Sequence, residues 1–185
     1  LDVAPGEMVT LAGRTGAGKS TIFKLILGDY EPWAGMVHVW GVDAAQLAPQ
    51  ARRRFVGHVD QAFRAVPGTV ADQITLGDPS ISREEMAQAA RLAGIGGALE
   101  TLPQGYDTPY AEGLLSQGQT QLLSIARAVA ANPKLLLLDE ITANLDSGTE
   151  QQVMEALRRA SQNRAVLSIS HRLYEQSGQG RIVQI

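Results

Sequence analysis

Short apolar runs that suit β-strands recur along this chain. Met8–Ala12, Met36–Trp40 and Phe55–Val59 contain β-branched or aromatic residues and are flanked by turn-forming or polar residues. Lys134–Leu138 is a nearly continuous apolar run, which is typical of a strand buried on both faces of a parallel sheet. Ala165–Ser170 is predicted to be the next strand.

Segments with helical patterns lie between these runs. Thr21–Leu27 contains no helix breaker, and Gln119–Ala131 ends at an Asn-Pro pair that stops a helix. A further helix is predicted over about residues 148–160. Ser82 and Glu85 have the spacing of a capping box at the start of another helix. Strands that alternate with helices predict an α/β fold with a parallel core.

The predicted secondary structure is mostly helical between residues 62 and 131. We therefore expect one domain over residues 1–185, with a core of about residues 1–61 and 131–185. A helical subdomain of about residues 62–130 is expected as an insertion into this core. A length of 185 residues is sufficient for a substantial hydrophobic interior.

One glycine-rich stretch lies between the first predicted strand and the first predicted helix. Residues 13–20, Gly-Arg-Thr-Gly-Ala-Gly-Lys-Ser, match the pattern G-x-x-x-x-G-K-[ST] at every fixed position. Glycines allow the backbone to approach phosphates closely, and the amides at the helix N-terminus can donate to an anion. Lys19 can reach the β- and γ-phosphates, and the Ser20 hydroxyl can bind magnesium. This stretch predicts a nucleotide-binding loop.

Composition narrows the function classes further. The net charge of -3 gives no electrostatic reason to expect binding to nucleic acid or to an anionic membrane surface. The chain has no cysteine, so disulfides and thiolate metal sites are excluded. No apolar run approaches the roughly 20 residues that span a bilayer. The first residue is Leu1, so we expect a piece of a longer polypeptide.

Polar residues follow several of the predicted strands at their carboxyl ends, where open α/β sheets bind ligands. Asp139 can hold magnesium, and Glu140 could polarise the water that attacks the γ-phosphate. Gln61 could contact metal-bound water, and His171 could contact the γ-phosphate through an imidazole nitrogen. Each of these residues alone could be an ordinary polar residue of a turn. Their convergence on strand ends favours a catalytic site.

Residues 115–119, Leu-Ser-Gln-Gly-Gln, precede the long predicted helix. A serine and a glycine at a helix N-terminus offer a hydroxyl and free amides to an anion. The same residues could serve only as a good N-cap. Physical chemistry alone leaves both interpretations open.

The ordered set of motifs resembles the nucleotide-binding domain of an ABC transporter ATPase, and most closely the exporter branch. The resemblance covers essentially the whole chain. Its motifs are the Walker A loop at residues 13–20, the Q-loop at Gln61, the signature at residues 115–119, Walker B at residues 135–139 with Glu140, the D-loop at residues 144–146 and the switch residue His171. It implies a P-loop NTPase fold, a RecA-like parallel sheet with a helical subdomain between the Q-loop and the signature.

The resemblance also implies a role for each matched position. ATP and Mg²⁺ would be the cofactors, with Glu140, His171 and Gln61 as catalytic residues. Magnesium would be held by Ser20, Gln61 and Asp139. Two such domains, identical or different, would pair head to tail, so that the signature of one meets the nucleotide of the other. The nucleotide-binding residues would be Gly13, Arg14, Thr15, Gly16, Ala17, Gly18, Lys19, Ser20, Thr21, Ser116, Gln117, Gly118 and Gln119.

The implied partner outside the domain is a transmembrane permease, which ATP binding and hydrolysis would drive through alternating access. The domain would then act at the cytoplasmic face of a membrane. A rival interpretation is a soluble ABC ATPase that acts on nucleic acid or ribosomes, but such proteins usually carry long insertions and basic surfaces. A second rival is a regulatory nucleotide-binding module that does not hydrolyse ATP.

The sequence departs from the family pattern at three places. Gln117 stands where the family most often has glycine, and residues 110–114 form a loop about two residues shorter than usual. That loop normally meets the membrane domains, so we expect altered coupling between subunits. Only twelve residues precede Gly13, and the family's adenine-stacking aromatic normally lies further upstream.

Overall fold

The computed structural model describes residues 1–139, 145–169 and 180–185. Its contacts divide the chain into two compact units. The first contains residues 1–58, 132–140 and 163–185, and the second contains residues 59–131 and 141–162. The helix at residues 147–161 belongs by its contacts to the second unit. The sequence-based division of the chain into core and subdomain stays a prediction.

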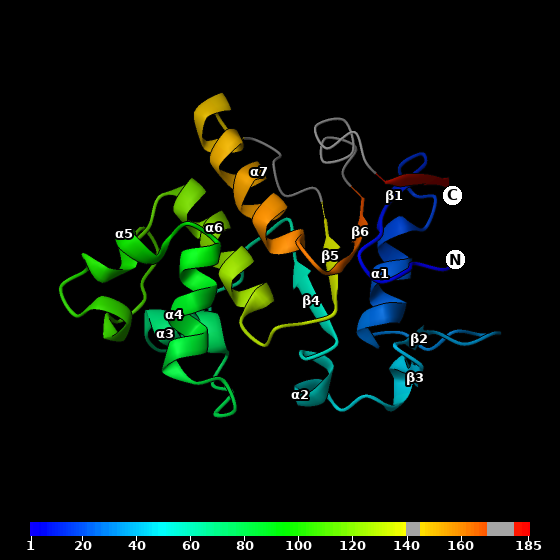
Figure 1. Ribbon diagram of the computed structural model, residues 1–185, viewed down its shortest axis with the longest axis horizontal. Coiled ribbons are helices and arrows are strands. Elements are labelled where there is room, and N and C mark those ends of the chain that lie inside the picture. Colours follow the sequence, from blue (N-terminus) through cyan, green and yellow to red (C-terminus); the bar gives the residue numbers. More distant parts are fainter. Residues whose placement is uncertain (140–144, 170–179) are drawn as a thin grey trace. The chain divides into compact units, whose positions relative to one another are not determined.

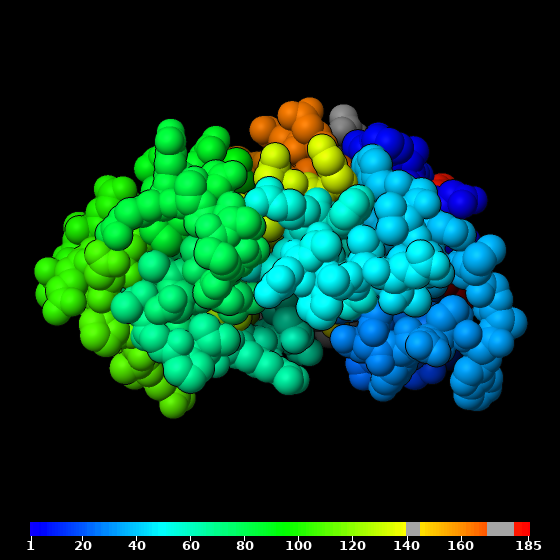
Figure 2. All heavy atoms as spheres, turned by 90° about the horizontal axis from the view of Figure 1, so that it is seen from below, coloured from blue at the N-terminus to red at the C-terminus, as the bar shows by residue number. Residues whose placement is uncertain are grey.

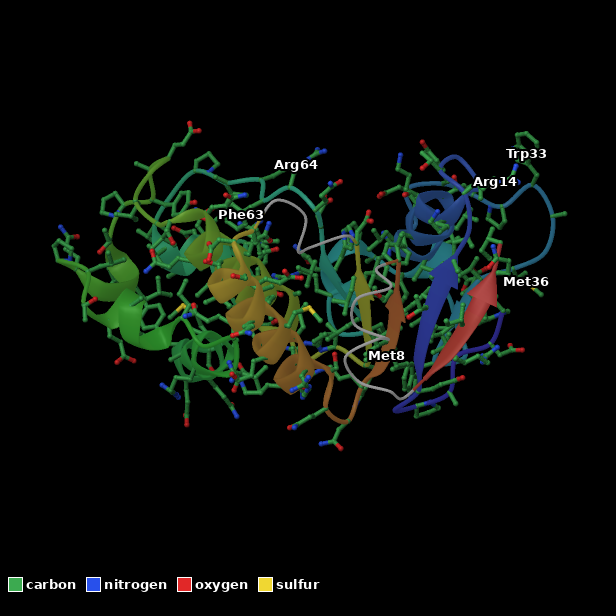
Figure 3. All side chains as sticks on the ribbon, turned by 90° about the horizontal axis from the view of Figure 1, so that it is seen from above. Met8, Arg14, Trp33, Met36, Phe63 and Arg64 are labelled. Carbon is green, nitrogen blue, oxygen red and sulfur yellow. The ribbon has the colours of Figure 1, made fainter. Side chains whose placement is uncertain are left out.

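The first unit is built on a five-stranded sheet with the order β4-β5-β6-β1-β7. The pairs β5–β6, β6–β1 and β1–β7 are parallel, as the alternation of strands and helices predicted. Figure 3 shows these strands side by side, with Met8 labelled on β1 and Arg14 on the loop that follows it. The strands are β1 (Met8–Ala12), β4 (Val56–Val59), β5 (Leu135–Leu138), β6 (Ala165–Ser168) and β7 (Arg181–Gln184).

Helix α1 (Lys19–Leu27) packs its apolar face into the core of the first unit. Phe23 and Ile26 are buried in one cluster with Val9, Leu137 and Leu167 from the central strands. All four residues of β5 are buried, which fits the continuous apolar run in the sequence. Burial of such side chains contributes about 1.5–3 kcal/mol each. The same packing fixes the start of α1 against the end of β1.

The predicted strand at residues 36–40 is shorter than expected. Only β2 (His38–Val39) forms, and it pairs antiparallel with β3 (Val42–Asp43) in a separate two-stranded hairpin. Trp40 and Gly41 both have positive φ, which is the backbone conformation of a tight hairpin turn. The turn therefore ends the strand one residue earlier than the apolar pattern suggested.

Three adjacent arginines occupy residues 52–54, and the first of them has a structural role. Arg52 is half-buried, and its guanidinium donates to the carbonyl oxygens of Ala44 and Leu47 at 3.1 and 2.8 Å. A Cβ built on Gly28 would overlap this guanidinium, so glycine gives it room. The short helices around it are η1 (Ala44–Gln46) and α2 (Pro49–Arg52).

The loop between α1 and β2 presents large apolar side chains to the surface. Trp33 is fully exposed, and Tyr30 and Met36 are half exposed or more. Trp40, in the hairpin turn that follows β2, is also exposed. Figure 3 labels Trp33 and Met36 on this loop, and Figure 2 shows its surface in light blue at the rim of the first unit. These side chains contribute little to the buried core.

The second unit is a cluster of helices, labelled in Figure 1. Its most buried helix is α6, whose residues from Gln121 to Ala126 are all buried. Helices α3, α4 and α7 all pack against it. The helices are α3 (Val70–Thr75), α4 (Arg83–Leu92), α5 (Gly96–Glu100), η2 (Gly105–Asp107), α6 (Gln117–Val129) and α7 (Ser147–Ser161). None of the helices among the described residues is both long and apolar enough to cross a membrane.

Candidate functional site

The glycine-rich loop adopts the backbone that an anion-binding loop requires. Gly16 and Gly18 have φ values of 83° and 99°, in the left-handed region that favours glycine. Gly18 is the N-cap of α1 and supplies no side-chain acceptor, and the first turn of α1 contains no acidic residue. The first amides of α1 are therefore available to an anion, and the helix dipole favours negative charge there.

Lys19 folds back over this loop. Its ammonium donates to the carbonyl oxygens of Gly13 at 2.8 Å and Arg14 at 3.0 Å. An ammonium has three donors and no acceptor, so it can meet an anion held by the same loop. The neighbouring Ser20 is exposed in the first turn of α1, where its hydroxyl is accessible to a ligand.

Gly13, the first fixed glycine, is explained by close packing. A Cβ built there would lie 2.8 Å from the carbonyl oxygen of Ile185, closer than carbon and oxygen atoms can approach. The amide of Ile185 donates to the carbonyl of Ala12 at 2.8 Å. The strand β7 therefore supports the start of the loop, and a larger residue at position 13 would push the two apart.

Asp139 follows β5 directly and is half-buried. Strands β5 and β1 each pair in parallel with β6, so their carboxyl ends meet the same edge of the sheet. Asp139 and the loop after β1 therefore lie at this edge, separated by one strand. A carboxylate and a serine hydroxyl are hard oxygen donors of the kind that Mg²⁺ prefers, so the residues present fit a magnesium ion.

Three of the predicted positions cannot be placed beside these groups. Glu140, Asn144 and His171 lie outside the described residues. Gln61 is exposed and belongs to the second unit, where its carbonyl oxygen accepts from Gln121 Nε2 at 3.4 Å. The structure thus brings together the loop and Asp139 and leaves the other catalytic assignments as predictions.

The signature residues form a capping box at the start of α6. The Ser116 hydroxyl accepts from the amide of Gln119 at 3.2 Å, and the Gln119 side-chain oxygen accepts from the amide of Ser116 at 2.9 Å. Ser116 is exposed, and its hydroxyl hydrogen is not used by the cap. Capping and anion binding are therefore compatible, because the hydroxyl can accept from the helix and donate outward.

Asp146, the described part of the D-loop with Leu145, caps α7. Its carboxylate accepts from the amides of Gly148 at 3.1 Å and Thr149 at 3.0 Å. Hydrogen bonds from the Thr149 side chain and amide, with that from Gly148, lower the pKa of Asp146. The carboxylate thus has a structural role in addition to any role at a subunit interface.

A groove in the second unit was missed by sequence reasoning. It has a volume of about 680 Å³ and combines the residues after Gln61 with those before and within the signature. The ring of Phe63 forms one wall and contacts Tyr110, with 5.9 Å between the ring centroids. Glu112 also lines the groove, and the side-chain oxygen of Gln121 is buried with no hydrogen-bond partner among the described residues. The sequence marked Gln61, residues 110–114 and the signature separately, but no local rule predicted that they line one groove, because these segments are far apart in the sequence.

Arg127 of α6 fixes the first wall of this groove. Its guanidinium lies 4.1 Å from the centroid of the Phe63 ring and donates to the carbonyl oxygens of Arg64 and Gln73 at 2.8 and 2.5 Å. Figure 3 labels Phe63 and Arg64 on this segment. Gln73 is fully buried, and its amide bonds to both backbone groups of Val66. An otherwise exposed segment is thereby held to the most buried helix of the unit.

Comparison with known proteins agrees with this geometry. The chain matches the family described as ABC transporter over residues 1–143. It is 39% identical to a fatty acid ABC transporter ATP-binding/permease protein of Mycobacterium tuberculosis over 94% of this chain and 28% of that protein. It is 40% identical to an ATM1-type heavy metal exporter of Novosphingobium aromaticivorans over 94% of this chain and 29% of that protein.

A solved structure supports the same conclusion. A bacterial Atm1-family ABC exporter with ATP bound is similar over 100% of this chain and 33% of that one, with a TM-score of 0.82 and 38% identity. The chain therefore spans about a third or less of these relatives. The fold and the loop define a P-loop NTPase domain. The chain belongs to the ABC transporter family and is similar to the nucleotide-binding domains of its exporters. The relatives described here lend no support to an action on nucleic acid.

Proposed function

We propose that this chain binds Mg²⁺–ATP and hydrolyses it as the motor domain of an exporter-type ABC transporter. The observation that carries the proposal is the loop at residues 13–20. This loop combines glycines with left-handed backbone, first-turn amides of α1 without a side-chain cap, and the ammonium of Lys19. Such a set of donors suits a triphosphate, and the loop lies at the edge of the sheet that also carries Asp139.

The roles follow from the chemistry of each side chain. Lys19 would neutralise charge on the β- and γ-phosphates, and Ser20 and Asp139 would hold magnesium. The resemblance to the family adds Gln61 as a further magnesium ligand. Bound magnesium supplies positive charge that offsets the charge of the phosphates. Glu140 accepts a proton from the attacking water while the oxygen of that water bonds to the γ-phosphorus. The bond to the bridging oxygen breaks, and ADP and phosphate leave.

The signature contributes to a second nucleotide in this proposal. The Ser116 hydroxyl accepts from the helix and can still donate its hydrogen, and the amides of Gln117 and Gly118 are the first two of α6. A second nucleotide-binding domain, identical or different, would place its γ-phosphate there in a head-to-tail pair. The arrangement explains why two helix starts in one chain are both suited to anions.

Replacement of Lys19 tests the proposal. We expect Lys19→Ala to weaken Mg²⁺–ATP binding at least about a hundredfold, because hydrogen bonds to charged groups contribute about 1.5–3 kcal/mol each. Hydrolysis should fall in parallel, while circular dichroism stays unchanged. Calorimetric titration measures the affinity. Lys24→Ala is the matched control, since this exposed lysine of the same helix contacts Tyr30 and not the loop. Unchanged ATP affinity in Lys19→Ala would refute the assignment.

The groove of the second unit is proposed to receive a cytoplasmic segment of the permease. It offers aromatic walls, an acidic rim at Glu112 and an unused acceptor on Gln121, which suits a short segment with apolar and hydrogen-bond-donor side chains. The chain would then act at the cytoplasmic face of a membrane, and the groove would transmit its movements to the permease. Transport itself is a property of the complete assembly.

Charge reversal at the groove tests this assignment. We expect Glu112→Lys to reduce the binding of the chain to the detergent-solubilised permease portion of its transporter by about threefold to fivefold, the range of an exposed ion pair. Affinity for ATP should not change, because the loop at residues 13–20 is untouched. Glu84→Lys is the control, as an equally exposed acidic residue on α4 that does not line the groove. Equal binding by both variants would place the permease elsewhere.

A further inference from the structure

The first turn of α6 sits against α7 at one glycine. A Cβ built on Gly118 would overlap the Cγ2 methyl of Thr149, and its two next nearest atoms would be Cβ and Oγ1 of the same threonine, both at 3.5 Å. Both residues belong to the second unit, where α6 and α7 pack together. Gly118 has ordinary helical geometry, so close packing against Thr149 is what excludes a larger residue.

Thr149 also belongs to the cap of α7. Its amide donates to the Asp146 carboxylate at 3.0 Å. A threonine is branched at Cβ, and its χ1 angle is restricted by this branching. The amide bond holds the backbone of Thr149 to Asp146, and the restricted χ1 angle sets where the methyl meets Gly118. The side chain is half-buried between the two helix starts.

We propose that Thr149 is a positioning residue that locks the first turn of α6 to the Asp146 cap of α7. Its amide is bonded to Asp146, and its methyl sets the position of Gly118. A displacement of the α7 cap thereby moves Ser116, Gln117 and Gly118 as one body. This inference rests on the proposed function, in which that turn meets the nucleotide of a second domain.

Two conservative variants separate the two halves of the threonine. Thr149→Ser keeps the hydroxyl and removes the methyl, while Thr149→Val keeps the methyl and removes the hydroxyl. Gly118→Ala introduces the overlap directly. In Gly118→Ala/Thr149→Ser the overlapping methyl is gone, and the remaining neighbours of the new Cβ lie at ordinary contact distance. Gly118→Ala/Thr149→Val is the matched control, because it retains the overlap.

The experiment measures ATP-dependent pairing of the chain in a Glu140→Gln background by analytical ultracentrifugation, with calorimetry for ATP affinity. We expect Gly118→Ala to weaken pairing at least about tenfold with ATP affinity changed less than about twofold, as local overpacking requires. Thr149→Ser should restore pairing to within about threefold of the parent, and Thr149→Val should not. Equal defects in both double variants would overturn the proposal.

Amide exchange on the nucleotide-free chain tests the same lock without any function. Thr149→Ser should accelerate exchange at Gln119, because loss of the methyl loosens the seat of the signature turn, whereas Thr149→Val keeps the methyl and should not. Failure of the parent to bind ATP or to pair would refute the proposed function alone. Unchanged exchange at Gln119 in Thr149→Ser would refute the lock, whatever the parent does.

Discussion

A short polar side chain caps the N-terminus of each of four helices in the second unit. Thr69, Ser82 and Ser116 each form a reciprocal capping box, and Asp146 accepts from two amides at the start of α7. Each cap satisfies amides that a helix cannot satisfy by itself, and its loss typically costs about 1 kcal/mol. Short polar residues at these positions therefore decide where the helices start.

The cap at Asp146 makes stability depend on pH. Hydrogen bonds, chiefly from the Thr149 side chain, lower the pKa of Asp146 in the folded chain from its ordinary value of 3.8. Their contribution to stability is therefore complete above that value and is lost as the pH falls through the lower folded pKa. We expect Asp146→Asn, which can still cap, to flatten the decline of the unfolding temperature between neutral pH and about pH 3. Thermal melts at several pH values measure this decline, and identical slopes for both proteins would contradict the expectation.

At the residue scale the sequence predicted the capping box of Ser82 and Glu85 and the nucleotide loop, because both follow local spacing rules. It left the role of Ser116 open between cap and anion site. The structure shows the cap and leaves the hydroxyl hydrogen available. The roles of Glu140 and His171 rest on the family resemblance, since these residues lie outside the described ranges.

At the element scale, α6 joins the signature to the groove. Its N-terminus carries the capping box, its interior is buried, and Arg127 near its end holds the segment that follows Gln61. Two features that the proposed function uses are thus attached to one rigid helix. A shift of α6 relative to its neighbours would change both.

Arg127 should therefore stabilise more than an exposed arginine does. We expect Arg127→Met to lower the free energy of unfolding by about 2–4 kcal/mol, through loss of charge-assisted hydrogen bonds and the contact with Phe63. Amide exchange in residues 63–66 should accelerate, because their anchor is gone. Arg83→Met, which breaks only the exposed ion pair with Asp107, should change little. Denaturant unfolding measures both variants, and similar small losses in the two would contradict the role of Arg127.

Most elements followed from apolar periodicity. The strands β1, β4 and β5 and the helices α1, α6 and α7 form within a few residues of the predicted ranges. The strand at residues 36–40 was overestimated, because the hairpin turn includes Trp40 as well as the flanking turn residue Gly41. The contacts of Arg52 and Arg127 join residues distant in the sequence, so no local rule could have predicted them.

At the scale of the whole molecule, the chain is one nucleotide-binding domain within a family of larger transport proteins. It spans about a third or less of the length of its described relatives. The sequence predicted the fold class from the order of strands and helices. The pairing of two domains is a prediction from the family resemblance. In that arrangement one copy of the chain would supply only half of each proposed site.

The molar mass of Glu140→Gln, measured in solution with and without Mg²⁺–ATP, tests the central claim most directly. The substitution removes the proposed base and should leave ATP bound but not hydrolysed. We predict a monomer that becomes a dimer only when Mg²⁺–ATP is added, and that returns to a monomer in Lys19→Ala/Glu140→Gln. A chain that binds Mg²⁺–ATP, as shown by titration of the same sample, and yet remains monomeric at every concentration would contradict the paired site.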